Sequence, residues 1–346
     1  MIIFLLASLV CSSLIVSAIN ANAQTPFYRG KTITLVMGSA PGGTADLRTK
    51  PIAAFLTKHI PGNPTIVMEY MPGGGSRKAT NHIYNVARRD GLTIGRMSSS
   101  IVPNAVLGEV GVQYDLDKLI YLGAAESAVH NIFFSRKEAG LDSLDALRSS
   151  SRLRIGTNPV GHTIYIMSRV FAYLIGLKDP QFIPAYDGPE LDLALRRGEV
   201  DAQAAVSSTL NREWVAKKLV NFHAVLEVPK GRSYPGFTNL PELESLVKTE
   251  KEGKLLGMVR AFRQVGAPII LPPGTPPERI ELLREAVRKM FKDPDFHKEY
   301  KKLTGDDATP LLPEEQERVI RDLPREREIV ELFKMFVGGA PLPRRS

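Results

Sequence analysis

Short apolar runs alternate with amphipathic stretches along most of the chain. Each apolar run in the first hundred residues ends in a turn rich in glycine or serine, as strands of a buried parallel sheet do. Pro51 is expected to kink the first of the intervening helices. Alternating strands and helices predict an open, mainly parallel α/β sheet, which binds ligands at the carboxyl ends of its strands. The predicted elements are strands 33–37, 65–68 and 92–97 and helices 47–56 and 78–86.

The same alternation restarts after an apolar run, 119–125, that is expected to cross between two domains. Its turns again follow the strands and are rich in glycine or serine, so two α/β units that face a cleft are predicted. The elements expected in this second unit are strands 131–134, 153–156, 182–185 and 199–206 and helices 142–147, 164–175 and 191–197.

The C-terminal region starts with a second apolar crossing strand, 266–273, and continues as helices. Prolines in the first turn and an apolar stripe predict an amphipathic helix from residue 275. Two more helices are expected over 296–302 and 314–336, the latter interrupted by Pro324. The apolar stripe consists of Ile280, Leu283, Val287, Met290 and Phe291.

The N-terminus has the pattern of a secretory signal. Residues 1–23 carry no charge, and an apolar stretch is followed by Ala21-Asn-Ala23, a small-x-small cleavage site. We predict cleavage near Ala23, a mature chain that starts near Gln24, and a periplasmic location. A membrane anchor is the alternative, because the apolar stretch approaches spanning length. The usual basic residue near the start is missing, which leaves open whether Met1 is the initiator.

Composition favours one class of ligand and excludes several kinds of site. The chain has 346 residues, with 45 basic and 37 acidic side chains and a net charge of +8, in mixed runs. For an exported protein this balance favours small anions over nucleic acid. The single cysteine, Cys11, lies within the signal. The mature chain therefore has no disulfide, cysteine nucleophile or thiolate metal site.

Residues 31–46 carry the most informative pattern. A predicted strand stops in a glycine-rich turn, and the turn passes directly into a helix. The first N–H groups of a helix have no partner within it, and with the helix dipole they attract anions. This segment is therefore expected to hold a carboxylate or a phosphate.

No catalytic constellation emerges from the remaining motifs. The six histidines never pair at i, i+4, there is no H-E-x-x-H or G-x-S-x-G, and 73–75 lacks the Lys-Ser/Thr of a P-loop. We therefore predict no catalytic residue, no metal and no cofactor. His162 is interpreted first as a helix cap or packed ring, and second as a donor to a ligand carboxylate. The turns at 98–100, 186–190 and 207–209 either only end strands or line a cleft.

At this point the chain resembles a known family, the extracytoplasmic solute receptors of the tripartite tricarboxylate transporter system, called Bug or TctC proteins. The resemblance extends over essentially the whole mature chain, and the order and spacing of its motifs make it specific. The motifs are 28–36 (YRGKTITLV), 41–46 (PGGTAD), 71–75 (MPGGG), 89–94 (RDGLTI), 154–157 (RIGT), 186–188 (YDG), 197–201 (RGEVD) and 272–277 (PPGTPP).

The resemblance implies an α/β fold of the periplasmic-binding-protein type II class, with two α/β lobes joined by two crossing strands. We expect lobe 1 to be discontinuous, with residues 24–124 plus 267–346, and lobe 2 to comprise residues 125–266. The implied function is that of a monomeric periplasmic receptor that captures a small organic carboxylate for the membrane components of such a transporter. Two alternatives stay open: a periplasmic hydrolase or isomerase that uses His162, and a ligand-sensing module for a membrane sensor kinase.

In this family backbone amides and waters hold the carboxylate, which makes Gly42 and Gly43 the implied amide donors. Asp46 is implied either to cap the helix or to meet a polar part of the ligand. Which acid is bound is not specified by these motifs. Together the residue patterns and the resemblance give these candidate ligand contacts: Ser39, Pro41, Gly42, Gly43, Asp46, Ser99, Ser100, Thr157, Asn158, Gly161, His162, Thr163, Tyr186, Gly188 and Ser207.

Overall fold

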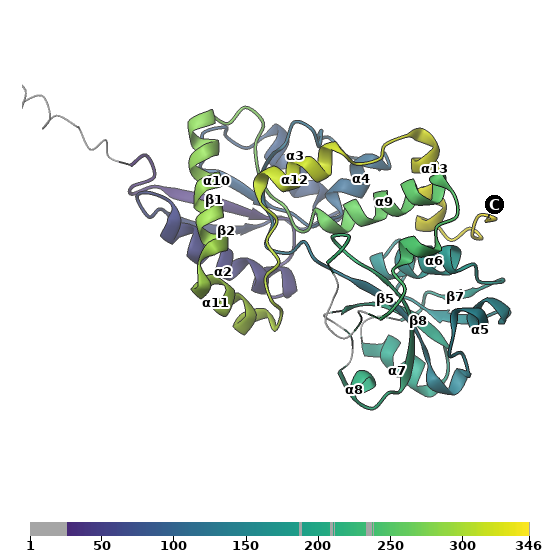
Figure 1. The fold of residues 1–346 in the computed structure, drawn as a ribbon. Helices are drawn as coiled ribbons and strands as arrows, with labels where there is room; N and C mark the ends of the chain where they lie inside the picture. Colours follow the sequence, from purple (N-terminus) through teal and green to yellow (C-terminus); the bar gives the residue numbers. More distant parts are fainter. Residues whose placement is uncertain are drawn as a thin grey trace, which may run out of the picture.

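A computed structural model describes residues 26–186, 189–207, 210, 212–232, 237 and 239–345. The described chain forms two five-stranded sheets with helices packed around them (Figure 1). The predicted signal, 1–23, lies outside the described residues. The strands are β1 Thr32–Met37, β2 Thr65–Tyr70, β3 Thr93–Arg96, β4 Ile120–Gly123, β5 Asn131–Arg136, β6 Arg154–Gly156, β7 Gln181–Ile183, β8 Ala202–Val206, β9 Val220–Leu226 and β10 Ile269–Leu271.

Helices cover both sheets, and most of them start where the sequence pattern predicts. The proline expected to kink the first helix, Pro51, lies inside α2, which continues through it without a break. The helices are α2 Thr44–His59, α3 Arg77–Asn85, α4 Ile101–Val106, α5 Leu144–Ser149, α6 Thr163–Ile175, α7 Pro189–Arg197, α8 Arg212–Ala216, α9 Glu250–Gln264, α10 Pro277–Lys292, α11 Pro294–Thr304, α12 Pro313–Arg321 and α13 Arg327–Val337, with short 3₁₀ turns η1 Lys137–Ala139 and η3 Leu243–Leu246.

The strand directions follow from the way the chain passes between the sheets. The first sheet has the order β2-β1-β3-β10-β4, and the second has the order β7-β6-β8-β5-β9. In the first, β10 runs antiparallel to β3 and β4; in the second, β5 runs antiparallel to β8 and β9. Both β10 and β5 are reached from the other sheet, so each begins at the edge where its two antiparallel neighbours end. The carboxyl edges of the parallel strands are therefore the edges at which the chain crosses.

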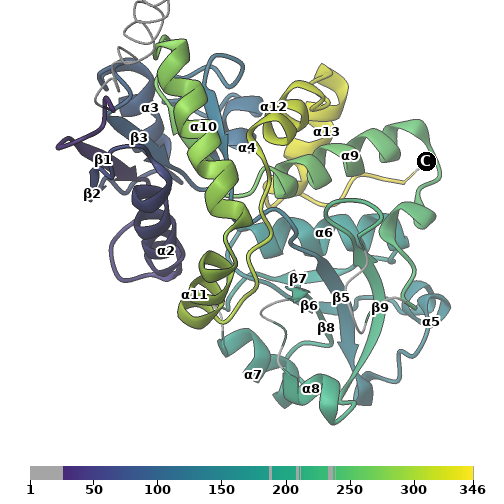
Figure 2. The same cartoon turned by 60° about the vertical axis from the view of Figure 1, so that its left-hand side comes forward.

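The amphipathic helix predicted from residue 275 is α10. Its apolar stripe is buried against β4 and α2, and α11 packs on α2 beside it. Phe296 of α11 is fully buried and makes an edge-on contact with Phe55 of α2, with ring centroids 5.8 Å apart. These helices form the outer layer of the first sheet (Figure 2).

The C-terminal residues pack against elements of the other expected lobe. Residues 327–345, which we assigned to lobe 1, pack against α6 and α9 of the second unit. The reason is the apolar stripe of α13: Phe336 meets Tyr173 of α6, and Phe333 meets Phe262 of α9. Beyond the helix, Arg345 forms an ion pair with the buried Glu252 at 2.7 Å. The lobe boundaries remain proposals.

The two crossings between the sheets touch each other. Gly266 has φ +67, and a Cβ there would lie 1.8 Å from the backbone oxygen of Glu126 on the other crossing. The Glu126 side chain pairs with the buried Arg96 at 2.7 Å and lies 3.8 Å from Arg48. The crossings are thus held by close backbone contact and by an ion pair with the end of β3. Within the described residues, no helix is long and apolar enough to span a membrane.

We predict that Gly266→Ala strongly destabilises the protein, because the new methyl group meets backbone that cannot move aside. Gly305 is the matched control: it has φ +77, but nothing lies within 4 Å of its Cβ position. Gly305→Ala should cost about 1 kcal/mol from backbone strain alone, and Gly266→Ala about 2–4 kcal/mol. Urea unfolding of the two variants measures the difference. Equal losses of unfolding free energy in the two variants would show that the backbone of the crossings can move aside for the methyl group.

Candidate functional site

Ser76 ties together three loops at the carboxyl edge of the first sheet. Its hydroxyl donates to the Gly38 carbonyl at 3.0 Å and accepts from the Ser98 amide at 2.9 Å. A Cβ at Gly38 would lie 2.2 Å from this hydroxyl, so the close approach requires glycine there. The loops after β1, β2 and β3 are therefore fixed relative to one another.

The Asp46 side chain stabilises the loop after β1 by hydrogen bonds. Its buried carboxylate accepts from the Tyr70 hydroxyl at 2.6 Å and from the Gly42 amide at 3.1 Å, and it pairs with Lys50 at 3.1 Å. The hydrogen bond from Tyr70 is the largest cause that lowers the pKa of Asp46. The Gly42 amide is thus occupied by Asp46 in this structure, and of the two implied donors Gly43 is the one we retain.

Gly43 begins α2 with its backbone open on one side. It is the N-cap residue, with φ −88, and no side chain caps the helix. Nothing lies within 4 Å of the position a Cβ would take. The start of α2 therefore presents backbone amides that a ligand oxygen can approach.

The turn after β6 is organised by polar contacts of its own. Asn158 donates to the Tyr186 carbonyl at 3.2 Å, which joins this turn to the one after β7. His162 is the N-cap of α6: its Nδ1 accepts from the Ile164 amide at 3.2 Å. This is the capping role that we preferred for the residue. The Tyr186 hydroxyl donates to Glu199 at 3.2 Å.

One cavity brings candidate residues of both units together. Ser99 and Ser100, at the start of α4, and Thr163, at the start of α6, line a space of about 60 Å³. The remaining lining comes from α9 and α13 as well as from α4 and α6. It consists of Pro103, Ile166, Met167, Val259, Phe262, Arg263 and Phe333.

The other candidates do not line this cavity. Thr157 is fully buried and donates to the Asn158 carbonyl at 2.9 Å. The Ser207 amide donates to the His130 carbonyl at 3.0 Å. The Ser39 hydroxyl is buried without a hydrogen-bond partner. Pro41 and Gly161 are exposed, and Gly188 lies outside the described residues.

Arg263, with the rest of α9, was missed by the sequence analysis. A signal was present: Thr249 accepts from the Glu252 amide at 3.2 Å, the T-x-x-E start of a capped helix. Apolar residues at 255, 256, 259 and 262 follow it with helical spacing. Nothing in this pattern, however, shows that the end of the helix reaches the cavity.

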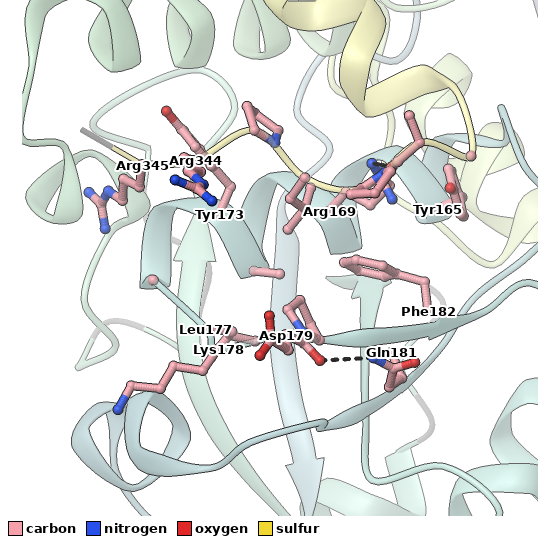
Figure 3. Close-up of a pocket in the computed structure, with 18 of the residues that line it drawn as sticks. Tyr165, Arg169, Tyr173, Leu177, Lys178, Asp179, Gln181, Phe182, Arg344 and Arg345 are labelled. Carbon is pink, nitrogen blue, oxygen red and sulfur yellow. Dashed lines mark hydrogen bonds between the residues drawn. The ribbon is translucent and has the colours of Figure 1, made fainter.

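A second cavity, of about 740 Å³, is formed by the second unit and the C-terminal tail (Figure 3). It contains none of the candidate residues. Arg169 lines it and donates to the carbonyls of Met335 and Ala340 at 3.0 and 2.5 Å. This arginine is thus used to hold the tail against α6.

Ser135 and His223 form a serine–histidine pair, the arrangement that a hydrolase would need. Their Oγ and Nε2 atoms are 2.8 Å apart. Both side chains are buried, at 0% and 3% exposure, between β5 and β9, so a substrate has no access to the pair. Burial lowers the pKa of His223 to about 4, against a smaller opposing effect of Asp142. Across the part of the chain that the structure describes, no group of three His, Cys, Asp or Glu side chains is placed to hold a metal ion.

No protein-family model matches the sequence, and no curated protein matches it. Solved structures do match the fold. A TctC solute-binding protein from Polaromonas aligns with TM-score 0.68 and 16% identity over 90% of this chain and 99% of its own. MatC from Rhodopseudomonas palustris, with bound malate, aligns with TM-score 0.56 and 18% identity over 89% of this chain and 99% of its own. An R. palustris protein with adipate aligns with TM-score 0.58 and 18% identity over 90% of this chain and 99% of its own.

The chain has the fold of TctC-type solute-binding proteins. The predicted fold class, two α/β lobes of the periplasmic-binding type, is thereby confirmed. The Polaromonas structure is described as a solute-binding protein, and at this level of identity the likeness concerns the fold.

We predict that Gly43→Ala weakens carboxylate binding by about 1–3 kcal/mol while leaving the fold intact, because the methyl group blocks the amides of α2. Gly42→Ala is the contrasting variant. With φ +80 at Gly42, alanine is strained there and should destabilise the fold by about 1 kcal/mol. Calorimetric titration and thermal melts separate the two effects. Unchanged binding by folded Gly43→Ala protein would remove this loop from the site.

His223 should make stability depend on pH. Its pKa is about 4 in the folded protein and 6.5 when exposed. As the pH falls from 6.5 toward 4, the unfolded chain binds a proton at His223 that the folded protein does not. The stability present above pH 6.5 is therefore lost over this range. Between pH 7 and 5 the wild type should lose about 2 kcal/mol more than His223→Gln. Urea unfolding at pH 7, 6 and 5 measures this. Parallel curves for the two proteins would contradict the assignment.

Proposed function

We propose that this protein is an exported receptor that captures a small organic carboxylate between its two lobes. In this proposal it works as a monomer and delivers the acid unchanged to the membrane components of a tripartite tricarboxylate-type transporter. The fold is that of a TctC solute-binding protein, and it is shared by MatC with bound malate and by an R. palustris protein with adipate. The uncharged N-terminal segment with its Ala-x-Ala site supports export.

The observation that carries the proposal is the cavity lined from both sides. Ser99 and Ser100 belong to the unit of the first sheet, and Thr163 to the unit of the second. A ligand that contacts both units is bound best when they are close together. Binding therefore favours the closed arrangement through the difference in affinity between the two states.

Amides and hydroxyls supply the polar contacts in this proposal. In this proposal the loop 39–46 and the start of α2 offer backbone N–H groups from lobe 1, and the turn 157–163 and Tyr186 contribute contacts from lobe 2. Serine and threonine hydroxyls both donate and accept, so they adapt to carboxylate or hydroxyl groups of a ligand. The net charge of +8 acts at long range and raises the rate of capture of anions.

The enzymatic alternative lacks support in the described residues. His162 is engaged in capping α6, and the Ser135–His223 pair is closed off from solvent. We therefore propose binding without chemical change. A sensory role, in which the same closure signals to a membrane kinase, uses the same site and differs only in the partner.

We expect one acid of a carboxylate panel to compact the protein and to be recovered unchanged. With a dissociation constant of about 1 μM, a hundredfold excess should stabilise the fold by about 2.7 kcal/mol. Calorimetry, small-angle scattering and chromatography of the recovered acid measure affinity, closure and identity. A transformed acid would favour the enzyme, and a panel in which nothing binds would overturn the receptor.

A further inference from the structure

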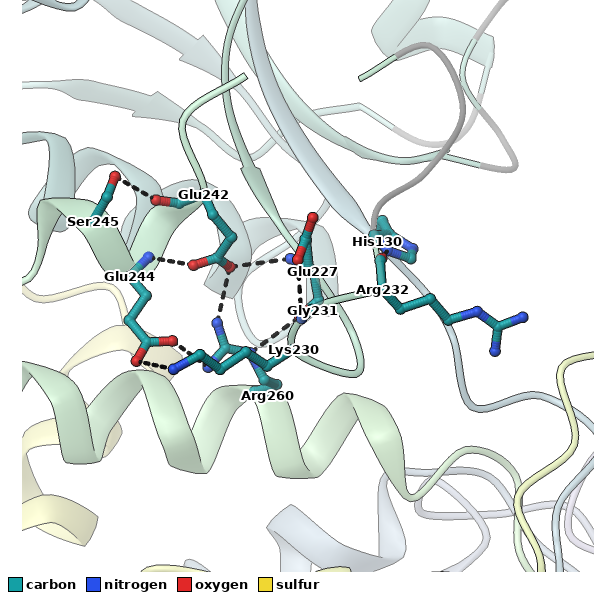
Figure 4. A network of polar contacts seen from close by, with 9 residues as sticks. All are labelled: His130, Glu227, Lys230, Gly231, Arg232, Glu242, Glu244, Ser245 and Arg260. Carbon is teal, nitrogen blue, oxygen red and sulfur yellow. Dashed lines mark hydrogen bonds and ion pairs between the residues drawn. The ribbon is translucent and has the colours of Figure 1, made fainter. Parts of the chain in front are cut away.

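Two arginines one turn apart on α9 have opposite surroundings. Arg260 is fully engaged: it donates to Glu242 at 2.8 Å, to Glu244 at 3.2 Å and to the Glu227 carbonyl at 3.0 Å (Figure 4). Lys230 completes this network through Glu244 at 2.7 Å. The network fixes the C-terminal half of α9 to the loop after β9, and thereby sets the position of the next turn.

Arg263, on that next turn, has no such partners. No described residue forms a hydrogen bond or ion pair with its guanidinium, and its Nε is buried without a partner. Burial lowers the pKa of Arg263 to about 10, with no acidic group opposing the change, so the side chain stays charged at neutral pH. The residue as a whole is half-buried, and a guanidinium whose Nε is shielded from water without a partner is stabilised by an anion that supplies one.

The side chain lies where an anion can reach it. Arg263 lines the cavity shared by the two units, together with the hydroxyl-bearing Ser99, Ser100 and Thr163. A guanidinium binds a carboxylate through two parallel N–H···O bonds, which hydroxyls can complement. The polar part of this cavity therefore suits one carboxylate group.

The rest of the cavity is apolar. Met167, Val259, Phe262 and Phe333 are between 1% and 6% exposed, and Ile166 and Pro103 complete the wall. A second carboxylate or a hydroxyl group placed against these side chains would lose its water without gaining a partner. An alkyl group would instead be buried favourably there, and because the space is about 60 Å³, an aryl ring enters only when the two units move apart.

We propose that Arg263 anchors the ligand's carboxylate and that the ligand is a monocarboxylate with an apolar body. This rests on the proposed receptor function and specifies its substrate class. It departs from the expectation that amides, hydroxyls and water suffice, because the anchor is a charged side chain from α9. In this proposal Arg263 binds the carboxylate first, and the amides of the 39–46 loop contact the ligand only after the lobes have closed.

The test compares isobutyrate and benzoate with malate, and benzoate with the uncharged benzamide, by calorimetric titration. Wild-type protein should bind isobutyrate or benzoate at least about tenfold more tightly than malate. Arg263→Gln should weaken binding of that acid by about 10- to 100-fold and leave benzamide binding unchanged. Lys254→Gln is the matched control, because it removes one charge from the same helix at an exposed position paired with Glu250 and Glu326. It should bind as the wild type does.

A folding readout separates anchoring from a structural role. Because Arg263 has no partner to lose, ligand-free Arg263→Gln should melt at or above the wild-type temperature. Arg263→Lys keeps the charge but not the two-pronged geometry, and should bind with intermediate affinity; it also serves if the glutamine variant fails to fold.

The outcomes are distinct. Wild-type affinity in Arg263→Gln, or a preference for malate over both apolar acids, overturns this inference and leaves the receptor function standing. Failure of every carboxylate to bind wild-type protein overturns both. Loss of benzoate binding together with a lowered melting temperature would mean a structural arginine, and would also overturn the anchor.

Discussion

The contact between the two crossings is the constraint on which the rest of the structure depends. Gly266 lies so close to the Glu126 backbone that no side chain fits between them. Because the chain must enter each sheet at this junction, β5 and β10 begin where the parallel strands end. The carboxyl edges of both sheets, with all their loops, are thereby turned toward one another, and the buried Arg96–Glu126 pair holds the junction to the first sheet.

Around that junction the two units are not independent. The stripe of α13, a late segment of the chain, is buried on α6 and α9, and Arg345 reaches Glu252. The small cavity is lined by α4 of the first unit and by α6, α9 and α13. In the proposed function a ligand in this cavity contacts both units, and its binding therefore favours the arrangement in which they are close together.

Polar groups at this edge fall into two kinds, and the difference between them carries the functional argument. Asp46, His162 and Arg260 are satisfied by neighbouring backbone or side chains, and they hold loops and helix ends in place. Arg263 and the Ser39 hydroxyl have buried atoms without partners. Buried polar atoms are normally paired. Unpaired ones also occur on Arg96 and Glu126 at the junction. Among the described residues, only the Arg263 Nε combines a missing partner with a place in the lining of the small cavity.

The alternation of apolar runs and turns was sufficient by itself to predict the α/β class, the two crossings and most strands and helices, because these depend on local periodicity. It also identified the turns at strand ends, and Ser99, Ser100 and Thr163 do meet at one cavity. Only the tertiary structure decided that Asp46 folds back on Gly42, that α13 packs on the second unit, and that Arg263 is left unpaired. Each of these depends on which distant segments become neighbours, and a side chain's partners across the fold leave no trace in the spacing of its own helix.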